Sequence, residues 1–163
     1  MKASTRIPGK VVDPGELVRM VQRWHKLGKK VVFTNGCFDI LHQGHLEVLS
    51  RAAELGDVLV IGVNSDESVH RLKGPERPVN DEGFRSLMLA SLTIVDAVCI
   101  FREDTPLELI SQVLPDVLVK GGDYQPEQIV GADLVKAHSG EVVTIPLVEG
   151  YSTSNLIRRI RQL

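Results

Sequence analysis

The amino-acid sequence predicts an α/β domain built on a doubly wound parallel sheet of about five strands. Three observations lead to this prediction. Short apolar runs recur along the chain without strict alternation of apolar and polar residues, which is typical of strands buried on both faces. Amphipathic helical segments separate these runs, so consecutive strands are expected to run parallel. A length of 163 residues suits one domain with a substantial core.

The first elements follow from apolar spacing and from helix stop signals. Residues 1–13 contain Pro and Gly and are expected to form a surface arm. A helix is predicted from Pro14, because apolar residues recur at helical spacing until Gly28 provides a stop. The next elements are an apolar strand, a helix and a second buried strand, at residues 31–33, 46–56 and 57–64.

The rest of the chain continues the alternation of helix and strand. Thr105 is predicted to cap a helix, since Pro106 suits its first turn and Glu108 completes a capping box. The elements predicted around this helix are a helix at 81–93, strands at 97–101 and 117–120, a helix at 126–138, a strand at 141–147 and a helix from Ser152.

Composition and charge indicate an ordinary globular protein. We expect one domain over 1–163, in which an arm and helix at 1–28 precede an α/β core at 29–163. The formal net charge of −2 gives no reason to expect general affinity for nucleic acid or anionic membranes. No apolar run approaches the ~20 residues that span a bilayer, and the N-terminal segment lacks the apolar region of a secretory signal. We therefore expect a cytoplasmic protein with reduced cysteines, Cys37 and Cys99.

Polar and glycine residues gather in the loops that follow the predicted strands. In doubly wound sheets, ligands bind beyond the carboxyl ends of the strands, where the winding direction reverses. This rule selects the loops at 34–45, 64–80, 102–105, 120–126 and 148–154 as candidate sites.

The first of these loops, TNGCFDILHQGH at residues 34–45, has the features of an anion site. It runs from a strand through a glycine-containing turn into a helix start, where backbone N–H groups are free. Gly36 and Gly44 permit close approach of the backbone to a ligand. His42 and His45 would project from nearly the same face of the first helical turn. Two imidazoles and a helix N-terminus that converge on one point suit a phosphate.

Other interpretations of this loop stay open on the residues alone. Zinc-binding histidine pairs on helices usually sit at i and i+4 and need a third protein ligand, and Asp39 is the only nearby candidate. A nucleophilic Cys37 would need an activating base, so packing at the strand end is favoured. The histidines could also simply cap and pack the helix start, although that explanation suits one histidine better than two that flank a glycine. We predict no metal site made by the protein.

Longer motifs carry a resemblance to a known family. The string GCFDILHQGH resembles the H-x-G-H signature of the nucleotidyltransferase superfamily, in the form with a preceding G-x-F-D that its cytidylyltransferase-like branch carries. The likeness continues through GVNSDESVHRLKGPERPV, RSLMLASL, VDAVCIFREDTPLELI, PDVLVKGGDY and PLVEGYSTSNLI, over about residues 28–160. In LKGPERPV, KGGDYQPEQIVGAD and EGYSTS, the chain most resembles the adenylyltransferase domain of bifunctional heptose kinase/adenylyltransferases. The resemblance implies a Rossmann-like nucleotidyltransferase fold.

The resemblance also implies a reaction and a set of site residues. ATP and D-glycero-D-manno-heptose 1-phosphate would give ADP-heptose and pyrophosphate. His42 and His45 would bind the triphosphate and stabilise charge at the α-phosphorus and on the leaving pyrophosphate. Lys73 would reach the reacting phosphates, with Arg77 and Arg85 near the phosphate of the sugar substrate. The residues implied in nucleotide binding are Thr34, Asn35, Gly36, Phe38, Asp39, Gly44, Lys120, Gly121, Gly122, Asp123, Ser152, Thr153 and Ser154.

Several of these residues also have a simpler explanation. Lys73 could be exposed in a polar loop, and Arg85 could be a solvated helix residue. The segment from Lys120 to Asp123 could be a plain turn. Ser152 could serve only as a helix N-cap.

The choice of nucleotide and of partners depends on the resemblance. Cytidylyltransferases of this branch often carry R-T where this chain has Pro146 and Leu147, which favours ATP over CTP. The alternatives are a cytidylyltransferase for glycerol 3-phosphate or a similar polyol phosphate, and a nucleotide-binding sensor without turnover. Mg²⁺ is expected with ATP, because phosphate oxygens and water supply most of its ligands. The expected partners are small-molecule substrates, and the resemblance implies a homodimer.

Overall fold

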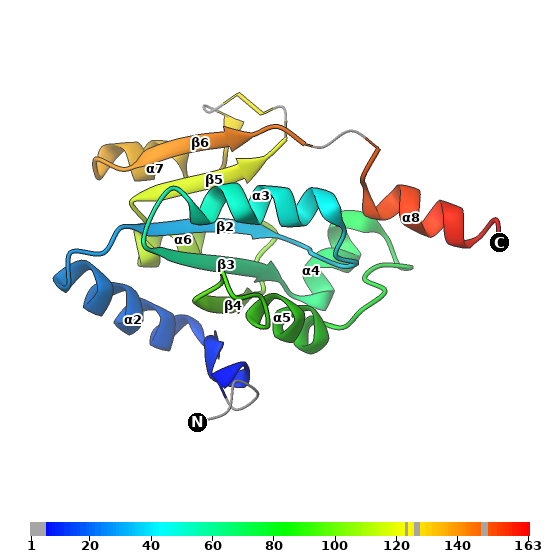
Figure 1. The fold of residues 1–163 in the computed structure, drawn as a ribbon, viewed down its shortest axis with the longest axis horizontal. Coiled ribbons are helices and arrows are strands. Elements are labelled where there is room, and N and C mark those ends of the chain that lie inside the picture. The colour runs from blue at the N-terminus through cyan, green and yellow to red at the C-terminus, as the bar shows by residue number, and fades with distance from the viewer. Residues whose placement is uncertain (1–5, 123, 126–127, 148–149) are drawn as a thin grey trace.

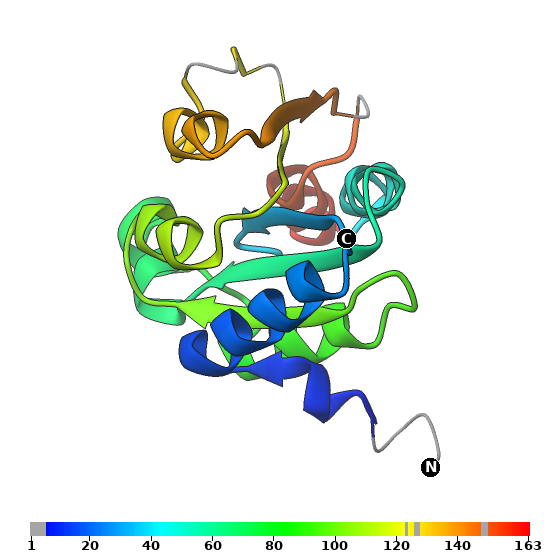
Figure 2. The same cartoon turned by 90° about the vertical axis from the view of Figure 1, so that its left-hand side faces the viewer.

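A computed structural model describes residues 6–122, 124–125, 128–147 and 150–163 of the chain. Within these residues, six parallel strands form one sheet in the order β1-β4-β3-β2-β5-β6. Helices cover both faces of the sheet (Figure 1, Figure 2). The predicted doubly wound α/β fold is confirmed, with one strand more than expected.

The elements alternate along the chain as predicted. The strands are β1 (Val11–Val12), β2 (Val31–Gly36), β3 (Val58–Asn64), β4 (Ala97–Phe101), β5 (Val117–Gly121) and β6 (Glu141–Ile145). The helical elements are the 3₁₀ turn η1 (Pro8–Lys10), α2 (Pro14–Lys26), α3 (Gln43–Ala53), α4 (Asp66–Lys73), α5 (Glu82–Ala90), α6 (Leu107–Val113), α7 (Ala132–Ala137) and α8 (Thr153–Ile160).

The winding of the sheet reverses between β2 and β5. From β2 the chain moves outward through β3 and β4, and then returns to place β5 on the other side of β2. Phe33 of β2 is paired with Val60 of β3 on one side and with Leu118 of β5 on the other. In such sheets the ligand crevice lies at this reversal, beyond the carboxyl ends of the strands. The ends of β2 and β5 therefore mark the expected site.

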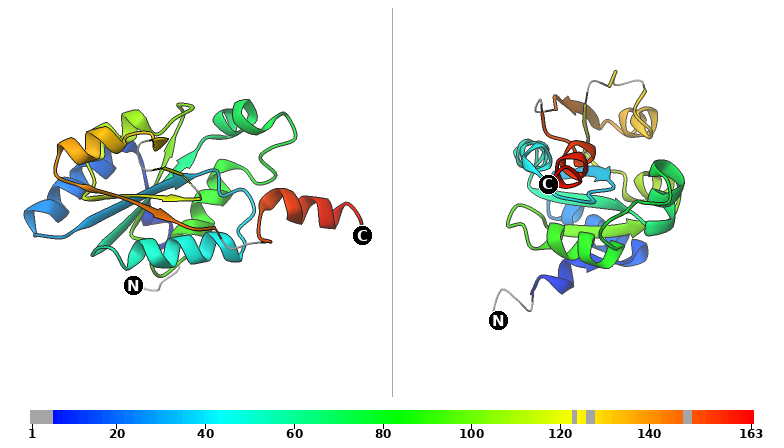
Figure 3. Two further views of the ribbon diagram at one scale, coloured as in Figure 1. Left: turned by 90° about the horizontal axis from the view of Figure 1, so that it is seen from above. Right: turned by 90° about the vertical axis from the view of Figure 1, so that its right-hand side faces the viewer.

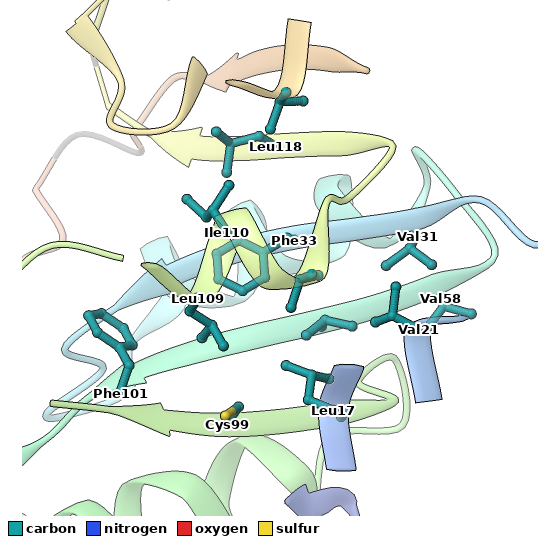
Figure 4. Close-up of a cluster of buried hydrophobic side chains, with 14 of the residues drawn as sticks. Leu17, Val21, Val31, Phe33, Val58, Cys99, Phe101, Leu109, Ile110 and Leu118 are labelled. Atoms are coloured by element: carbon teal, nitrogen blue, oxygen red, sulfur yellow. The ribbon is translucent and has the colours of Figure 1, made fainter. Parts of the chain in front are cut away.

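The two faces of the sheet carry separate hydrophobic clusters. On one face, Phe33 and Leu118 pack with residues of α2, α6 and α7, such as Leu17 and Ile110 (Figure 4). We call this the α2 face. The opposite face packs against α3 and α5, and we call it the α3 face. Because each strand alternates its side chains between the faces, every residue at a strand end is assigned to one of them.

Local capping signals set the starts of several helices. The side chains of Asp13, Ser65, Asp81 and Ser152 accept hydrogen bonds from backbone N–H groups in the first turns of α2, α4, α5 and α8. Such caps are worth about 1 kcal/mol each. The predicted capping role of Ser152 is confirmed, with a distance of 3.1 Å from Asn155 N to Ser152 Oγ.

The structure corrects the prediction for the N-terminal arm. Residues 11–12 were expected in a surface arm, but they form the edge strand β1, in which Val11 pairs with Val98 and Val12 with Cys99. A run of two residues is too short to show the period of a strand in the sequence. The prediction therefore missed β1 and gave five strands instead of six. Lys10 ties the same segment to the domain, since its Nζ donates to the carbonyl of Val95 at 2.6 Å.

Other boundaries also differ from the predictions. Residues 64–80 were expected to form a loop, but they contain α4, whose polar face hid the helical period. Thr105 does not cap α6, which begins one residue later with Pro106 at the N-cap and no capping side chain. The helix predicted at 126–138 begins at Ala132, and residues 126–127 lie outside the described part.

The C-terminal helix α8 lies past the carboxyl ends of the strands and projects from the body of the domain (Figure 1, Figure 3). None of its residues is buried, and Ile160 is exposed. Across the described residues, no helix has the length and apolar character needed to cross a membrane.

Candidate active site

A cavity of about 630 Å³ opens at the carboxyl ends of the strands, at the reversal of the winding. Its walls come from β2, β3 and β5, from the starts of α3 and α8, and from the segments around α4 and α6. Most of the predicted site residues line it. They are Thr34, Asn35, Gly36, Phe38, Asp39, His42, Gly44, His45, Lys73, Arg77, Lys120, Gly121, Ser152, Thr153 and Ser154.

A second cavity, of about 460 Å³, lies beside the edge strand β1. Its walls include the carboxylates of Asp13, Glu82, Glu103 and Glu108, with Arg102 as the cationic residue among them. This charge is unfavourable for a triphosphate, and none of the predicted site residues lies there.

The two signature histidines meet at the start of α3. His42 is the N-cap residue and His45 lies in the first turn, so their rings stack with centroids 3.8 Å apart and an angle of 26° between the planes. Both Nδ1 atoms are buried, and neither has a hydrogen-bond partner among the described residues. Buried polar atoms in native proteins are nearly always hydrogen-bonded, and both imidazoles line the cavity, so this unpartnered pair indicates a place for a ligand.

Burial keeps both imidazoles neutral near pH 7. It lowers the pKa of His42, and together with the charge of His42 it lowers the pKa of His45 to about 4. A neutral imidazole offers one N–H donor and one acceptor nitrogen. The pair can therefore donate hydrogen bonds to phosphate oxygens without carrying a charge beforehand, and a bound polyanion would favour its protonation.

Two helix N-termini converge on these histidines. A Cβ added to Gly44 would lie 3.1 Å from the His42 ring and 3.4 Å from the Cβ of Tyr151, which precedes α8. Thr153 Oγ1 reaches the carbonyl oxygen of Ile40 at 3.5 Å. Free backbone N–H groups at helix starts attract anions, and here two such starts face the same space. Gly44 is needed because a side chain would crowd the imidazole.

Cationic side chains line the same cavity as the histidines. Lys73 ends α4, and Lys120 stands near the end of β5. Burial lowers the pKa of Lys120, and repulsion from Lys73 acts in the same direction. Lys120 Nζ also lies 5.9 Å from the ring centroid of Tyr124, within the range of a cation–π contact. The two ammonium groups are thus close enough to act on a shared anion.

Asp39 is buried and fully engaged by the loop after α4. Its carboxylate accepts from Arg77 Nε at 2.5 Å and from the amides of Val79 and Asn80 at 2.8 and 2.9 Å. Burial by itself would raise the pKa of Asp39, but the hydrogen bonds from Asn80, Val79 and Arg77 lower it overall. Asp39 therefore stays ionised and holds Arg77 on the cavity wall.

Arg85 lies inside the protein, not on the cavity wall. It is 1% exposed, and its guanidinium donates to Cys37 O at 2.6 Å, Asn80 O at 3.0 Å and Asp66 Oδ1 at 2.8 Å. The alternative of a solvated helix arginine is therefore wrong. In the structure, Arg85 joins the histidine loop to α4 and to the loop after it. Its predicted contact with the sugar phosphate stays a prediction.

Gly122 does not line the cavity, and Asp123 lies outside the described residues. Residues 120 and 121 belong to β5, so the alternative of a plain turn fails for the first half of that segment. Lys73 is exposed, as its simpler explanation required, but it lies at a helix end that borders the cavity.

Cys37 lines the cavity without the properties of a nucleophile. Burial raises the pKa of its thiol, although Lys73, Arg85 and Arg77 act in the opposite direction. A protonated thiol is a poor nucleophile. Within the described residues, no group of three His, Cys, Asp or Glu side chains could hold a metal ion, so no third ligand joins the two imidazoles there.

Sequence patterns missed part of the wall. Asn64 ends β3 and Thr105 precedes α6, and both positions follow strands that the sequence did predict. The lining residues that were not predicted are Cys37, Val48, Asn64, Leu72, Asp104, Thr105, Pro106, Tyr124, Gln128, Ile129, Val130, Leu147 and Tyr151. For Asn64 and Thr105, a position at the end of a strand or after it was the available signal, but it does not distinguish wall residues from other loop residues.

Curated relatives match most of this chain. It is 53% identical over 150 residues to the bifunctional protein HldE of Gluconobacter oxydans, a match that covers 92% of this chain and 31% of the relative. It is 52% identical over 164 residues to the bifunctional protein HldE of Hyphomonas neptunium, with coverage of 98% and 34%. The chain thus spans about a third of the length of these relatives.

Solved structures and a family model agree with the fold. A lipopolysaccharide core biosynthesis protein from Thermoplasma volcanium superposes with a TM-score of 0.60 at 30% identity, covering 77% of this chain and all of that protein. A pantoate-beta-alanine ligase from Francisella tularensis, at 15% identity and TM-score 0.61 over 94% of this chain and 79% of its own, shares the fold alone. The model of the cytidylyltransferase-like family matches residues 33–159, and this chain therefore belongs to the cytidylyltransferase-like family.

Proposed function

We propose that this chain is an adenylyltransferase that transfers AMP from ATP to D-glycero-D-manno-heptose 1-phosphate, giving ADP-heptose and pyrophosphate. One observation carries the proposal. The stacked pair His42 and His45 has two unpartnered buried nitrogens where the starts of α3 and α8 converge, in a cavity that Lys73 and Lys120 also line. Identity above 50% to proteins named HldE supports the choice of nucleotide and sugar.

The reaction needs positioning more than proton transfer. An oxygen of the sugar phosphate attacks the α-phosphorus of ATP and forms a new P–O bond, while the bond to the β-phosphate breaks and pyrophosphate leaves. The attacking group is already an anion, so no strong base and no covalent enzyme intermediate are required. The obstacle is repulsion between two polyanions, and catalysis should come from alignment and from stabilisation of charge.

The site residues divide this work between them. His42, His45 and the amides at the starts of α3 and α8 would hold the triphosphate and stabilise charge on the leaving pyrophosphate. Lys73 and Lys120 would neutralise the two phosphates where they meet, with Arg77 beside them. We propose that ATP reacts as its Mg²⁺ complex, because Mg²⁺ is held mainly by phosphate oxygens and water.

The ribose and base would lie between the end of β5 and the start of α8. Gly121, Leu147 and Tyr151 line this part of the cavity with backbone and apolar surface, which suits a flat base. The predicted contact of Asp123 with the ribose stays a prediction. We also propose that the protein acts in the cytoplasm as a homodimer, on the basis of the family resemblance.

Pyrophosphate release tests the assignment. The protein is incubated with Mg²⁺, ATP or CTP, and either heptose 1-phosphate or glycerol 3-phosphate. We expect release only with ATP and heptose 1-phosphate. Release only with CTP would contradict the adenylyltransferase assignment, and tight ATP binding without release under any combination would favour a nucleotide sensor.

A further inference from the structure

The sheet divides the cavity into two lobes with different chemistry. Thr34 lies on the α3 face with the histidines and α8, because it is two residues beyond Val32 of that cluster. Asn35 follows Phe33 on the α2 face, and so does Asn64. A Cβ added to Gly62 would lie 2.9 Å from the Phe33 ring and 3.4 Å from the Asn35 Cβ, and Asn64 is two residues farther along. The α2-face lobe thus contains amides and not imidazoles.

The amide of Asn64 is oriented by its neighbours. Ser68 Oγ donates its only hydrogen to the carbonyl of Glu103 at 3.0 Å, so it must accept from the Asn64 amide, whose Nδ2 lies 3.0 Å away. Asn64 Oδ1 is therefore fixed on the other side. Within the described part of the chain, Asn64 Oδ1 accepts no hydrogen bond. It is not one of the buried atoms that lack a partner, so it is accessible. Since Asn64 is 4% exposed and lines the cavity, Oδ1 is the acceptor that it offers to a ligand.

Thr105 and Asp104 add polar groups to the same lobe. The Thr105 hydroxyl caps no helix, because the N-cap of α6 is Pro106 and no side chain caps this helix. The helix α6 packs on the α2 face. Among the described residues this hydroxyl makes no hydrogen bond, and Thr105 lines the cavity. One carboxylate oxygen of Asp104 accepts from Arg71 Nε at 2.6 Å, and the other can accept from a ligand hydroxyl.

We propose that the α2-face lobe binds the polyhydroxyl part of the acceptor sugar, with Asn64 Oδ1 and the Thr105 hydroxyl as specificity-determining contacts to sugar hydroxyls. This rests on the proposed function of the same cavity. The lobe is rich in acceptors, and Asp104 makes it unfavourable for a second phosphate. Lys120 extends from the same face of β5, so an acceptor phosphate held there would leave its sugar ring beside Asn64.

A binding experiment separates this lobe from the reaction. The probes are heptose 1-phosphate and inorganic phosphate, which has no sugar hydroxyls, and each is titrated by calorimetry in the presence of Mg²⁺ and α,β-methylene-ATP. We expect Asn64→Ala to weaken heptose 1-phosphate binding about 10-fold and Thr105→Val about 3-fold, with phosphate binding changed less than about 2-fold. Gln112→Ala, an amide outside this cavity, should leave both unchanged.

Each outcome decides the inference. Equal losses for heptose 1-phosphate and for inorganic phosphate, or no loss in either variant, would overturn it. Wild-type protein that binds heptose 1-phosphate no tighter than inorganic phosphate would overturn it as well. Thr105 is exposed, so Thr105→Val decides the question if Asn64→Ala fails to fold. Pyrophosphate release by wild-type protein reports on the proposed function separately, because these affinities are measured without turnover.

Discussion

The segment made of the loop after β2 and the first turn of α3 holds two polar sites, which differ in how their polar atoms are satisfied. At its end, His42 and His45 keep buried Nδ1 atoms without a partner among the described residues. At its start, Asp39 accepts three hydrogen bonds, and Cys37 O accepts one from Arg85. We call the histidine site the open site, because its Nδ1 atoms have no partner among the described residues. We call the Asp39 site, with the Arg85 contact to Cys37 O, the saturated site, because its polar atoms are hydrogen-bonded. Polar atoms thus lack protein partners where a ligand is expected, and they are hydrogen-bonded where they hold the cavity wall in place.

The largest expected effect is on the saturated site. Arg85→Met should lower the free energy of unfolding by about 3–5 kcal/mol, because it leaves two partly buried carbonyls and the Asp66 carboxylate without their donor. Urea unfolding measures this loss. Arg19→Met is the matched control, since its pair with Glu16 is exposed and screened by solvent and should contribute little to stability. Similar losses in the two variants would show that the Arg85 contacts do not hold the site.

The next largest effect is on the open site, where a substitution should reduce turnover and leave folding stability nearly unchanged. His45→Ala should reduce turnover at least ~100-fold, about 2.7 kcal/mol of transition-state stabilisation, with little loss of folding stability. The imidazole makes no protein hydrogen bond at Nδ1, so its removal costs the fold little. Steady-state pyrophosphate release and thermal unfolding measure the two quantities. His138→Ala, on the exposed side of α7, is the control, and near wild-type turnover in His45→Ala would contradict its role.

The pH dependence of stability should distinguish the two sites. Burial holds the pKa of His45 at about 4 in the folded protein, below its ordinary value of 6.5. Stability linked to neutral His45 should be complete above pH 6.5 and should be lost as pH falls toward about 4. The pKa of Asp39 is also lowered, so its contribution should be lost at lower pH, below the ordinary aspartate value of 3.8. Urea unfolding between pH 7 and pH 4 tests this, and His45→Ala should flatten the decline.

The smallest effect should come from the N-cap of α8. Ser152→Ala removes the hydroxyl that accepts from Asn155 N, and should cost about 1 kcal/mol locally. Hydrogen exchange of the α8 amides measures this loss. We expect a few-fold weaker binding of ATP as a consequence, because the start of α8 faces the histidines. Ser50→Ala, at an exposed position in α3, should change neither quantity.

The sequence could predict the open site but not the saturated one. The imidazoles, the glycine between them and the helix start lie within a few residues, so spacing alone indicated their convergence. Asp39 and Arg77 are 38 residues apart, and Arg85 lies 48 residues from Cys37. Contacts over such distances depend on how α4 and α5 pack, and no local period records them. Arg85 looked like a helix surface residue because charged side chains are rarely buried.

The sheet shows the same division between local and tertiary information. Five strands have apolar runs long enough to recognise, whereas β1 has only Val11 and Val12 and exists because it pairs with β4. The sequence indicates only that Asn64 ends a buried strand. Its role depends on Ser68 and Glu103, whose positions follow from α4 and the loop after β4.

In the proposed function, the unpartnered histidines His42 and His45 bind the triphosphate of ATP. The most direct measurement is the nitrogen NMR spectrum of the five histidines during a titration with Mg²⁺ and α,β-methylene-ATP. We predict that the ring signals of His42 and His45 shift and that the pKa values of these two histidines rise toward the ordinary value. The ring signals of His25, His70 and His138 should not shift. Saturating nucleotide that leaves His42 and His45 unaltered would contradict the account.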